Sequence, residues 1–218
     1  MLKITIIGNN LSYLEFEKAL KPFRIFPVSE ARKTFSRFDS RRLVEWQEKG
    51  YLKKVINKWY LFADIPLTEE LGYRIGNCIH HPSYISLQSA LSYYSLIPEA
   101  VYTQQAITTG KTIRYSTPVG SFSYYHIKPK FYFGYSILKF EGLPVLMAEP
   151  EKALLDYLYL SPQIKTTSDI TTMRLNATVL RANFDWEKFL QYARVVNSTV
   201  LDKRINLVKK SIRNAYTE

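Results

Sequence analysis

The segment EPEKALLD gathers four side chains that could do chemistry, namely Glu149, Glu151, Lys152 and Asp156. Carboxylates and a lysine that follow a strand-like run are what a metal-dependent nuclease would use to hold its metal. The spacing from acid to lysine differs by one residue from such a motif, and Pro150 favours an ordinary helix start. We therefore expect the glutamates to complement the helix dipole, with Glu151 and Lys152 at the surface and no catalysis.

Two further motifs fail as sites. QAITTGKT is similar to a phosphate loop, but Gln105 replaces its first glycine and a strand-like run follows where a helix is needed. The histidines and the single cysteine lack the spacing of a zinc site. They are His80, His81, His126 and Cys78. We expect no metal, no cofactor and no enzymatic activity, and a nuclease at the first segment remains an alternative.

The composition excludes wholesale disorder and a membrane-spanning chain. Of the 218 residues, 46% are hydrophobic and 15% are aromatic, which is enough for a substantial core. No apolar run approaches the roughly 20 residues that a membrane helix requires, and the apolar start MLKITIIGNN is too short for a signal peptide. One cysteine cannot form an internal disulfide. We expect a cytoplasmic protein with no membrane partner.

Positive charge is concentrated at the two ends of the chain. The formal net charge is +11. Residues 1–64 carry 13 basic and 7 acidic side chains, residues 65–160 carry 7 of each, and residues 161–218 carry 10 and 5. Such an excess favours a polyanionic partner, either nucleic acid or a membrane surface. The alternative is a basic surface that is simply solvated.

Three short helices are predicted near the N-terminus. Ser12 and Glu15 form a capping box for the first, which Pro22 closes. The second fits residues 29–35. The third fits residues 39–49, with Asp39 as its N-cap and a glycine just beyond its end.

A β-hairpin is predicted to follow these helices. After Gly50 the apolar period changes from 3.6 to 2, and only Asn57-Lys58 separates YLKKVI from WYLFA. We expect this turn to pair Ile56 with Trp59 and Val55 with Tyr60. Helices followed by a hairpin are the order of a winged helix-turn-helix, so residues 1–64 are predicted to be a DNA-binding domain.

The third helix has the division that a recognition helix needs. Leu43 and Trp46 fall on one face, and the arginines lie opposite or on its flank. Arginine can fork onto guanine in the major groove, while hairpin lysines contact phosphates. The predicted DNA-contacting residues are Arg37, Ser40, Arg41, Arg42, Lys53, Lys54 and Lys58. The alternative is a solvated helix whose arginines and lysines pair with Glu45.

Residues 65–218 are predicted to form a second, α+β domain with a helical end. A helix is expected through Tyr73 and another over residues 83–96, followed by five strand-like runs. A helix begins at Pro150, and Asp185 caps a later one. The basic terminal helix could add phosphate contacts through Lys203, Arg204, Lys209, Lys210 and Arg213. Its alternative is a helix that buries its apolar side and leaves the cations solvated.

Three motifs in the second part resemble one known family. They are PSYISLQSALSYYSLIPE, TPVGSFSYYHI and LMAEPEKALLDYLYL. The chain, from about Leu11 to Leu160, resembles the AbiEi antitoxins of bacterial type IV toxin–antitoxin and abortive phage-infection systems. The helical end is only loosely similar.

This resemblance implies a function. Such antitoxins repress their own operon by binding inverted repeats through an N-terminal winged helix-turn-helix. They also counteract a nucleotidyltransferase-type toxin without a stable complex, a role associated with the C-terminal domain. Double-stranded operator DNA and a cognate toxin are therefore the expected partners. A winged-helix protein–protein adaptor and a stand-alone repressor remain alternatives.

Overall fold

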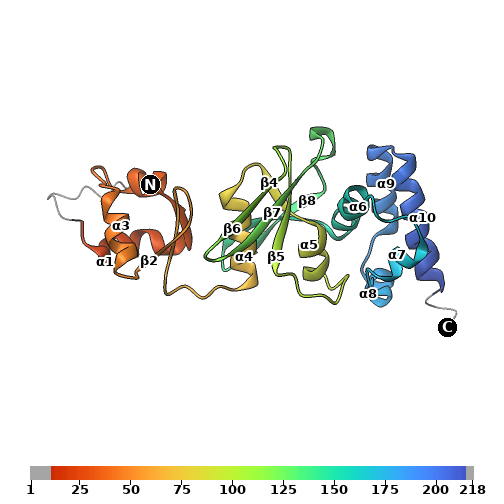
Figure 1. Cartoon of the computed structure of the whole chain (residues 1–218), viewed down its shortest axis with the longest axis horizontal. Helices are drawn as coiled ribbons and strands as arrows, with labels where there is room; N and C mark the ends of the chain where they lie inside the picture. The colour runs from red at the N-terminus through yellow and green to blue at the C-terminus, as the bar shows by residue number, and fades with distance from the viewer. Residues whose placement is uncertain (1–10, 215–218) are drawn as a thin grey trace.

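The computed structural model describes residues 11–214 and has a mixed α+β fold, as predicted. An N-terminal unit of helices with a small sheet, a larger central sheet and a bundle of C-terminal helices follow one another along the long axis of the molecule (Figure 1). The two ends of the described chain therefore lie far apart.

The N-terminal unit combines helices with a three-stranded antiparallel sheet of order β1-β3-β2. Its elements are α1 (Tyr13–Leu20), the 3-10 helix η1 (Lys21–Phe23), β1 (Ile25–Pro27), α2 (Val28–Thr34), α3 (Arg41–Glu48), β2 (Leu52–Ile56) and β3 (Trp59–Phe62). Strand β1 was not predicted from the sequence, and its pairing with β3 extends the predicted hairpin into a sheet.

The hairpin register is partly as predicted. Ile56 pairs with Trp59, but Lys54 and not Val55 faces Tyr60, because a bulge shifts the register between Lys54 and Ile56. At the turn, Lys58 adopts a left-handed φ of 68°. Its carbonyl accepts a hydrogen bond of 2.9 Å from the amide of Val28, which ties the hairpin tip to the start of α2.

Aromatic packing holds the N-terminal unit together. The Ser12–Glu15 capping box is present and starts α1, whose Phe16 is fully buried. The ring of Phe16 lies 4.4 Å from that of Trp46 on α3, centroid to centroid. The predicted N-cap of α3 was wrong by one residue: Ser40 holds that position, and Asp39 accepts a hydrogen bond from the amide of Arg41.

A short linker leads from β3 to the central part. Thr68 caps α4 (Glu69–Ile79), which packs against the central sheet and not within the N-terminal unit. The expected helix over residues 83–96 was wrong in its first turn. Residues 83–85 form strand β4 (Ser83–Ile85), and only α5 (Leu87–Tyr93) is helical.

The central sheet has six strands in the order β6-β7-β5-β4-β9-β8. Its other strands are β5 (Thr103–Thr108), β6 (Ile113–Thr117), β7 (Gly120–His126), β8 (Tyr135–Phe140) and β9 (Leu143–Ala148). The 3-10 helix η2 (Pro129–Phe131) precedes β8. The β5–β7 and β4–β9 pairs are parallel and the others antiparallel. β4 thus joins two groups of strands.

The C-terminal helices begin directly after the sheet. They are α6 (Pro150–Leu160), α7 (Thr167–Thr171), α8 (Ala177–Ala182), α9 (Trp186–Val196) and α10 (Thr199–Asn214). α6 contacts α5 and α9, and so connects this bundle with the central part. Asp185 caps α9 as predicted, with its carboxylate accepting from the amide of Lys188.

Candidate nucleic-acid interface

The exposed side of α3 presents an arginine and a valine. Leu43 and Trp46 are buried as predicted, which fixes the orientation of the helix. The Arg41 side chain is 91% exposed, and Val44, three residues later on the same face, is 53% exposed. Val44 was not among the residues predicted from the sequence, although its position one residue after a buried leucine places it on the outer face.

The hairpin beside α3 carries unpaired lysines. Lys53 and Lys54 on β2 and Lys58 in the following turn are exposed, and α3 packs against β2. Within residues 11–214, none of the three takes part in an ion pair. Their ammonium groups are therefore available to phosphates. Arg37, in the turn before α3, is exposed as well.

Carboxylates partly neutralise the positive charge on α3. Nε of Arg41 donates to Asp39 at 2.8 Å, and this hydrogen bond lowers the pKa of the Asp39 carboxyl. Lys49 pairs with Glu45 at 2.7 Å, as the solvated-helix alternative expects. To bind a base, the guanidinium of Arg41 must exchange Asp39 for guanine.

Arg42 is half-buried and makes contacts within the N-terminal unit, including an ion pair with Glu45. Its Nη2 donates to the carbonyl of Leu11 at 2.6 Å, and its guanidinium lies 5.2 Å from the centre of the Trp46 ring. These contacts hold the start of the described chain against α3. Ser40, as the residue preceding the helix, is half-buried.

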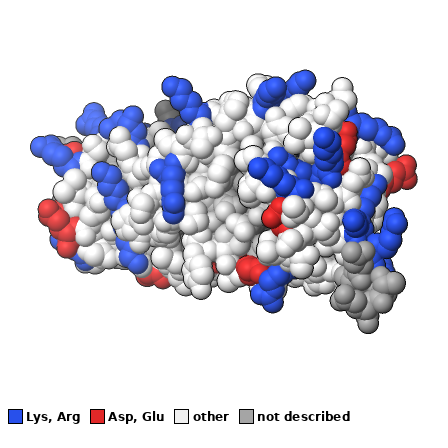
Figure 2. Space-filling model, turned by 45° about the vertical axis from the view of Figure 1, so that its right-hand side comes forward, with Lys and Arg blue, Asp and Glu red and all other residues white. Residues whose placement is uncertain are grey.

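The basic residues of α10 lie at the opposite end of the molecule from α3 (Figure 1). Leu201, Ile205 and Val208 are buried, as the alternative for this helix expects. The exposed cations are Lys203, Lys209, Lys210 and Arg213. On the face drawn in Figure 2, Lys and Arg gather over both ends, with a largely uncharged band between them.

Arg204 is buried, so its prediction as a phosphate contact was wrong. Its guanidinium donates to the carbonyl of Leu158 at 2.7 Å and also to those of Tyr159 and Ile164. Since a buried guanidinium needs acceptors, these carbonyls hold it in place. Arg204 thereby fastens α10 to the end of α6.

Lys152 and Asp156 form a buried ion pair, which corrects the expectation that Lys152 lies at the surface. Both side chains are 1% exposed and pair with each other across one turn of α6. The hydroxyls of Tyr84 and Ser86 each donate to Asp156 at 2.9 Å. Burial lowers the pKa of Lys152 and raises that of Asp156, while their mutual contact opposes both shifts. The sequence did offer a signal for this pair, because Lys152 and Asp156 are four residues apart in a helix whose other residues are mainly aliphatic.

The two glutamates of EPEKALLD connect α6 with α9. Glu151 is buried as well, so the expectation that it lies at the surface was wrong, and it accepts a hydrogen bond from the amide of Asp185 at 3.0 Å. Lys188 pairs with Glu149 at 2.9 Å. In the part of the chain that the structure describes, no three His, Cys, Asp or Glu side chains are grouped so that they could hold a metal ion.

No protein-family model matches the sequence, and no curated protein matches it either. None of the helices among residues 11–214 combines the length and the apolar character that crossing a membrane requires. An inference about DNA binding therefore rests on the geometry of the N-terminal unit.

We expect His80 to make the stability of the fold depend on pH. Its ring packs 4.5 Å from that of Tyr124, and its Nε2 is buried with no hydrogen-bond partner among residues 11–214. Burial, then the charge of His81, lowers the His80 pKa below its ordinary 6.5. The contribution of His80 to the free energy of unfolding should therefore be fully present above a pH of about 6.5. It should be lost as the pH falls below that value, because the unfolded chain binds the proton more readily.

This decline can be assigned by comparing thermal unfolding at pH values of about 7.5 and 5.5. His80→Gln should lose less stability on acidification than the wild type. Ser116→Ala, at an exposed position whose side chain does not titrate in this range, should keep the wild-type pH dependence. Equal acid sensitivity of the wild type and His80→Gln would contradict this assignment.

Proposed function

We propose that residues 1–64 are a winged helix-turn-helix domain that binds double-stranded DNA and that residues 65–218 form the second domain. The chain would be a non-enzymatic antitoxin of the type IV class that represses its own operon and counteracts a nucleotidyltransferase-type toxin. The DNA-binding part is supported by the N-terminal unit, and the antitoxin part by the family motifs alone.

The observation that carries DNA binding is the combination of the topology with exposed cations. Three helices and a β1-β3-β2 sheet support this proposal, in which α3 would be the recognition helix and the β2–β3 hairpin the wing. Arg41 on α3 and the lysines of the hairpin are exposed, and α3 contacts strand β2 of that hairpin. A solvated helix with no ligand would need neither this topology nor exposed cations on the adjoining hairpin.

The proposed mechanism divides base contacts from phosphate contacts. The first turn of α3 enters the major groove, where Arg41 donates two hydrogen bonds to O6 and N7 of a guanine. Val44, on the same face, contacts a thymine methyl group. Lys53, Lys54 and Lys58 on the hairpin hold the adjacent phosphates and fix the register.

Binding should be tested on DNA from upstream of the protein's own gene, by fluorescence anisotropy over a range of salt concentrations. Lys54→Ala should weaken binding to this DNA and to random DNA alike, because Lys54 contacts only phosphate. The slope of log affinity against log salt should become shallower by about one. No binding of the wild type at low salt would refute the proposed function.

A protein partner is the second candidate function for the same face. Glu45 and Glu48 on α3, together with the exposed Val44, favour it, because these carboxylates would repel phosphates that they faced. Binding to such a partner would persist at high salt, whereas binding to DNA would not.

A further inference from the structure

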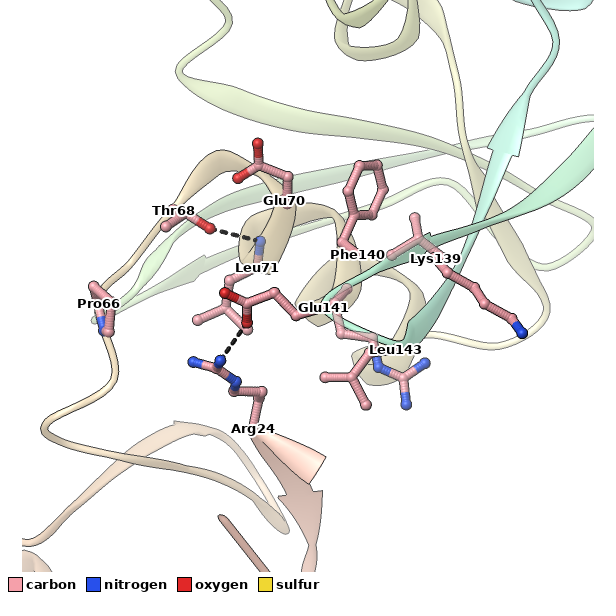
Figure 3. Close-up of a pocket in the computed structure, with 11 residues that line it drawn as sticks. Arg24, Pro66, Thr68, Glu70, Leu71, Lys139, Phe140, Glu141 and Leu143 are labelled. Carbon is pink, nitrogen blue, oxygen red and sulfur yellow. Dashed lines mark hydrogen bonds and ion pairs between the residues drawn. The ribbon is translucent and has the colours of Figure 1, made fainter. Parts of the chain in front are cut away.

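A cavity lies at the junction of the N-terminal unit and the central part. It has a volume of about 390 Å³. Arg24, between η1 and β1, lines it from the N-terminal side. The linker at Pro66, the first turn of α4 and the β8–β9 turn enclose it from the central side (Figure 3). A volume of this size suits a small organic molecule.

One ion pair crosses this cavity. Arg24 of the N-terminal unit pairs with Glu141 of the β8–β9 turn (Figure 3). The Glu141 side chain is 69% exposed, so its carboxylate is easily displaced into water. Arg24 itself has a φ of 63°, a left-handed conformation that a residue with a side chain rarely adopts. Arg24 is thus an arginine that the fold holds in a strained backbone conformation at the junction.

A second arginine at the cavity lacks part of its hydrogen bonding. Arg74 donates through Nη1 to the carbonyl of Pro144 at 2.8 Å. Its Nε is buried and has no partner within residues 11–214. A buried N–H without an acceptor is unfavourable, and a turn of the Arg74 side chain would bring Nε to an anionic oxygen in the cavity.

The remaining walls are mainly apolar. They include Leu71, Phe140, Leu143 and Val145. The ammonium group of Lys139 points away from the Arg24–Glu141 pair (Figure 3), so this residue contributes mainly its hydrocarbon stem. Glu70 and Glu141 are the acidic residues of the lining. Two arginines beside apolar walls suit a ligand with one anionic end and one apolar end.

We propose that the junction cavity binds a small organic acid with an apolar body. The ligand's carboxylate replaces that of Glu141 on Arg24 and accepts from Nε of Arg74, while its apolar part packs against Leu71 and Phe140. Glu141 therefore acts as an internal competitor that occupies Arg24 when the ligand is absent.

Such binding would break a link between the N-terminal unit and the central sheet. The orientation of α3 relative to the rest of the chain would then be less restrained, and operator affinity would change with ligand concentration. This regulatory consequence rests on the proposed function. The binding of the acid does not, and it can be measured without DNA.

The test uses phenylacetate and hexanoate as probes and phenylacetamide as the uncharged control. Ligand-observed NMR and calorimetry on the full chain should detect both acids and not the amide. Glu141→Gln should bind the acids about 3- to 10-fold more tightly, since it weakens the internal competitor. Arg24→Gln should abolish binding, and Glu99→Gln, at another surface ion pair, should leave it unchanged.

Three results would overturn the proposal. They are no binding of either acid to the wild type or Glu141→Gln at about 10 mM, equal binding of phenylacetamide, and weaker binding to Glu141→Gln. Glu141 lies in an exposed turn, so its variant should fold even if Arg24→Gln does not. If the acids bind but upstream DNA does not, the cavity proposal stands and the proposed function fails.

Discussion

Replacing Arg41 with alanine should weaken binding to the operator by about 1–3 kcal/mol and relax the preference for guanine at one position. In affinity this corresponds to roughly a 5- to 150-fold loss. The effect should be large because Arg41 is the exposed guanidinium in the first turn of α3. Anisotropy titrations against the operator and against single-base variants of it would measure both changes.

Two matched variants make this result specific. Lys128→Ala removes an exposed cation after β7, away from α3, and should leave operator affinity almost unchanged. Asp39→Asn removes the carboxylate that holds Arg41, so it should leave affinity unchanged or raise it. Unaltered operator affinity in Arg41→Ala would show that α3 does not enter the groove as proposed.

Replacing Lys152 with methionine should destabilise the fold by about 3–5 kcal/mol. The substitution leaves Asp156 buried without its cation, and only hydroxyl groups remain to solvate it. Urea unfolding, followed by far-ultraviolet circular dichroism, would give the change in the free energy of unfolding. Operator binding of the remaining folded protein should be unaffected, since the pair lies outside the N-terminal unit.

A double variant separates the ion pair from simple packing. Lys152→Met combined with Asp156→Leu removes both charges, so most of the lost stability should return. Glu187→Gln, at an exposed position of α9, serves as a neutral control. A loss below about 1 kcal/mol in the single variant would mean that Asp156 becomes protonated at little cost and that the pair contributes little.

Local signals in the sequence predicted local structure well. The Ser12–Glu15 capping box, the Asp185 cap and the turn at Asn57-Lys58 all depend on residues within a few positions of one another. β1 and β4 have only three residues each, and their strands exist because distant partners pair with them. Hydrophobic periodicity over so few residues cannot separate a strand from a helical turn.

The candidate site was predictable where side chains face solvent and not where they turn inward. Arg41 and the hairpin lysines are exposed because their neighbours Leu43 and Leu52 are the apolar residues of their elements. Arg42 and Arg204 find carbonyl acceptors from residues 31 to 46 positions away. Such contacts depend on tertiary structure, and a single sequence contains no signal for them.

The position of β4 has a consequence for how the molecule assembles. The β8–β9 hairpin and the β5–β7–β6 group are each built from segments close in sequence, and three residues of β4 connect them. The contact of β4 with β9 closes a loop of about 60 residues, which is slow to form. The two groups should therefore fold early and independently, and their union through β4 should be the late, rate-limiting event that completes the native state.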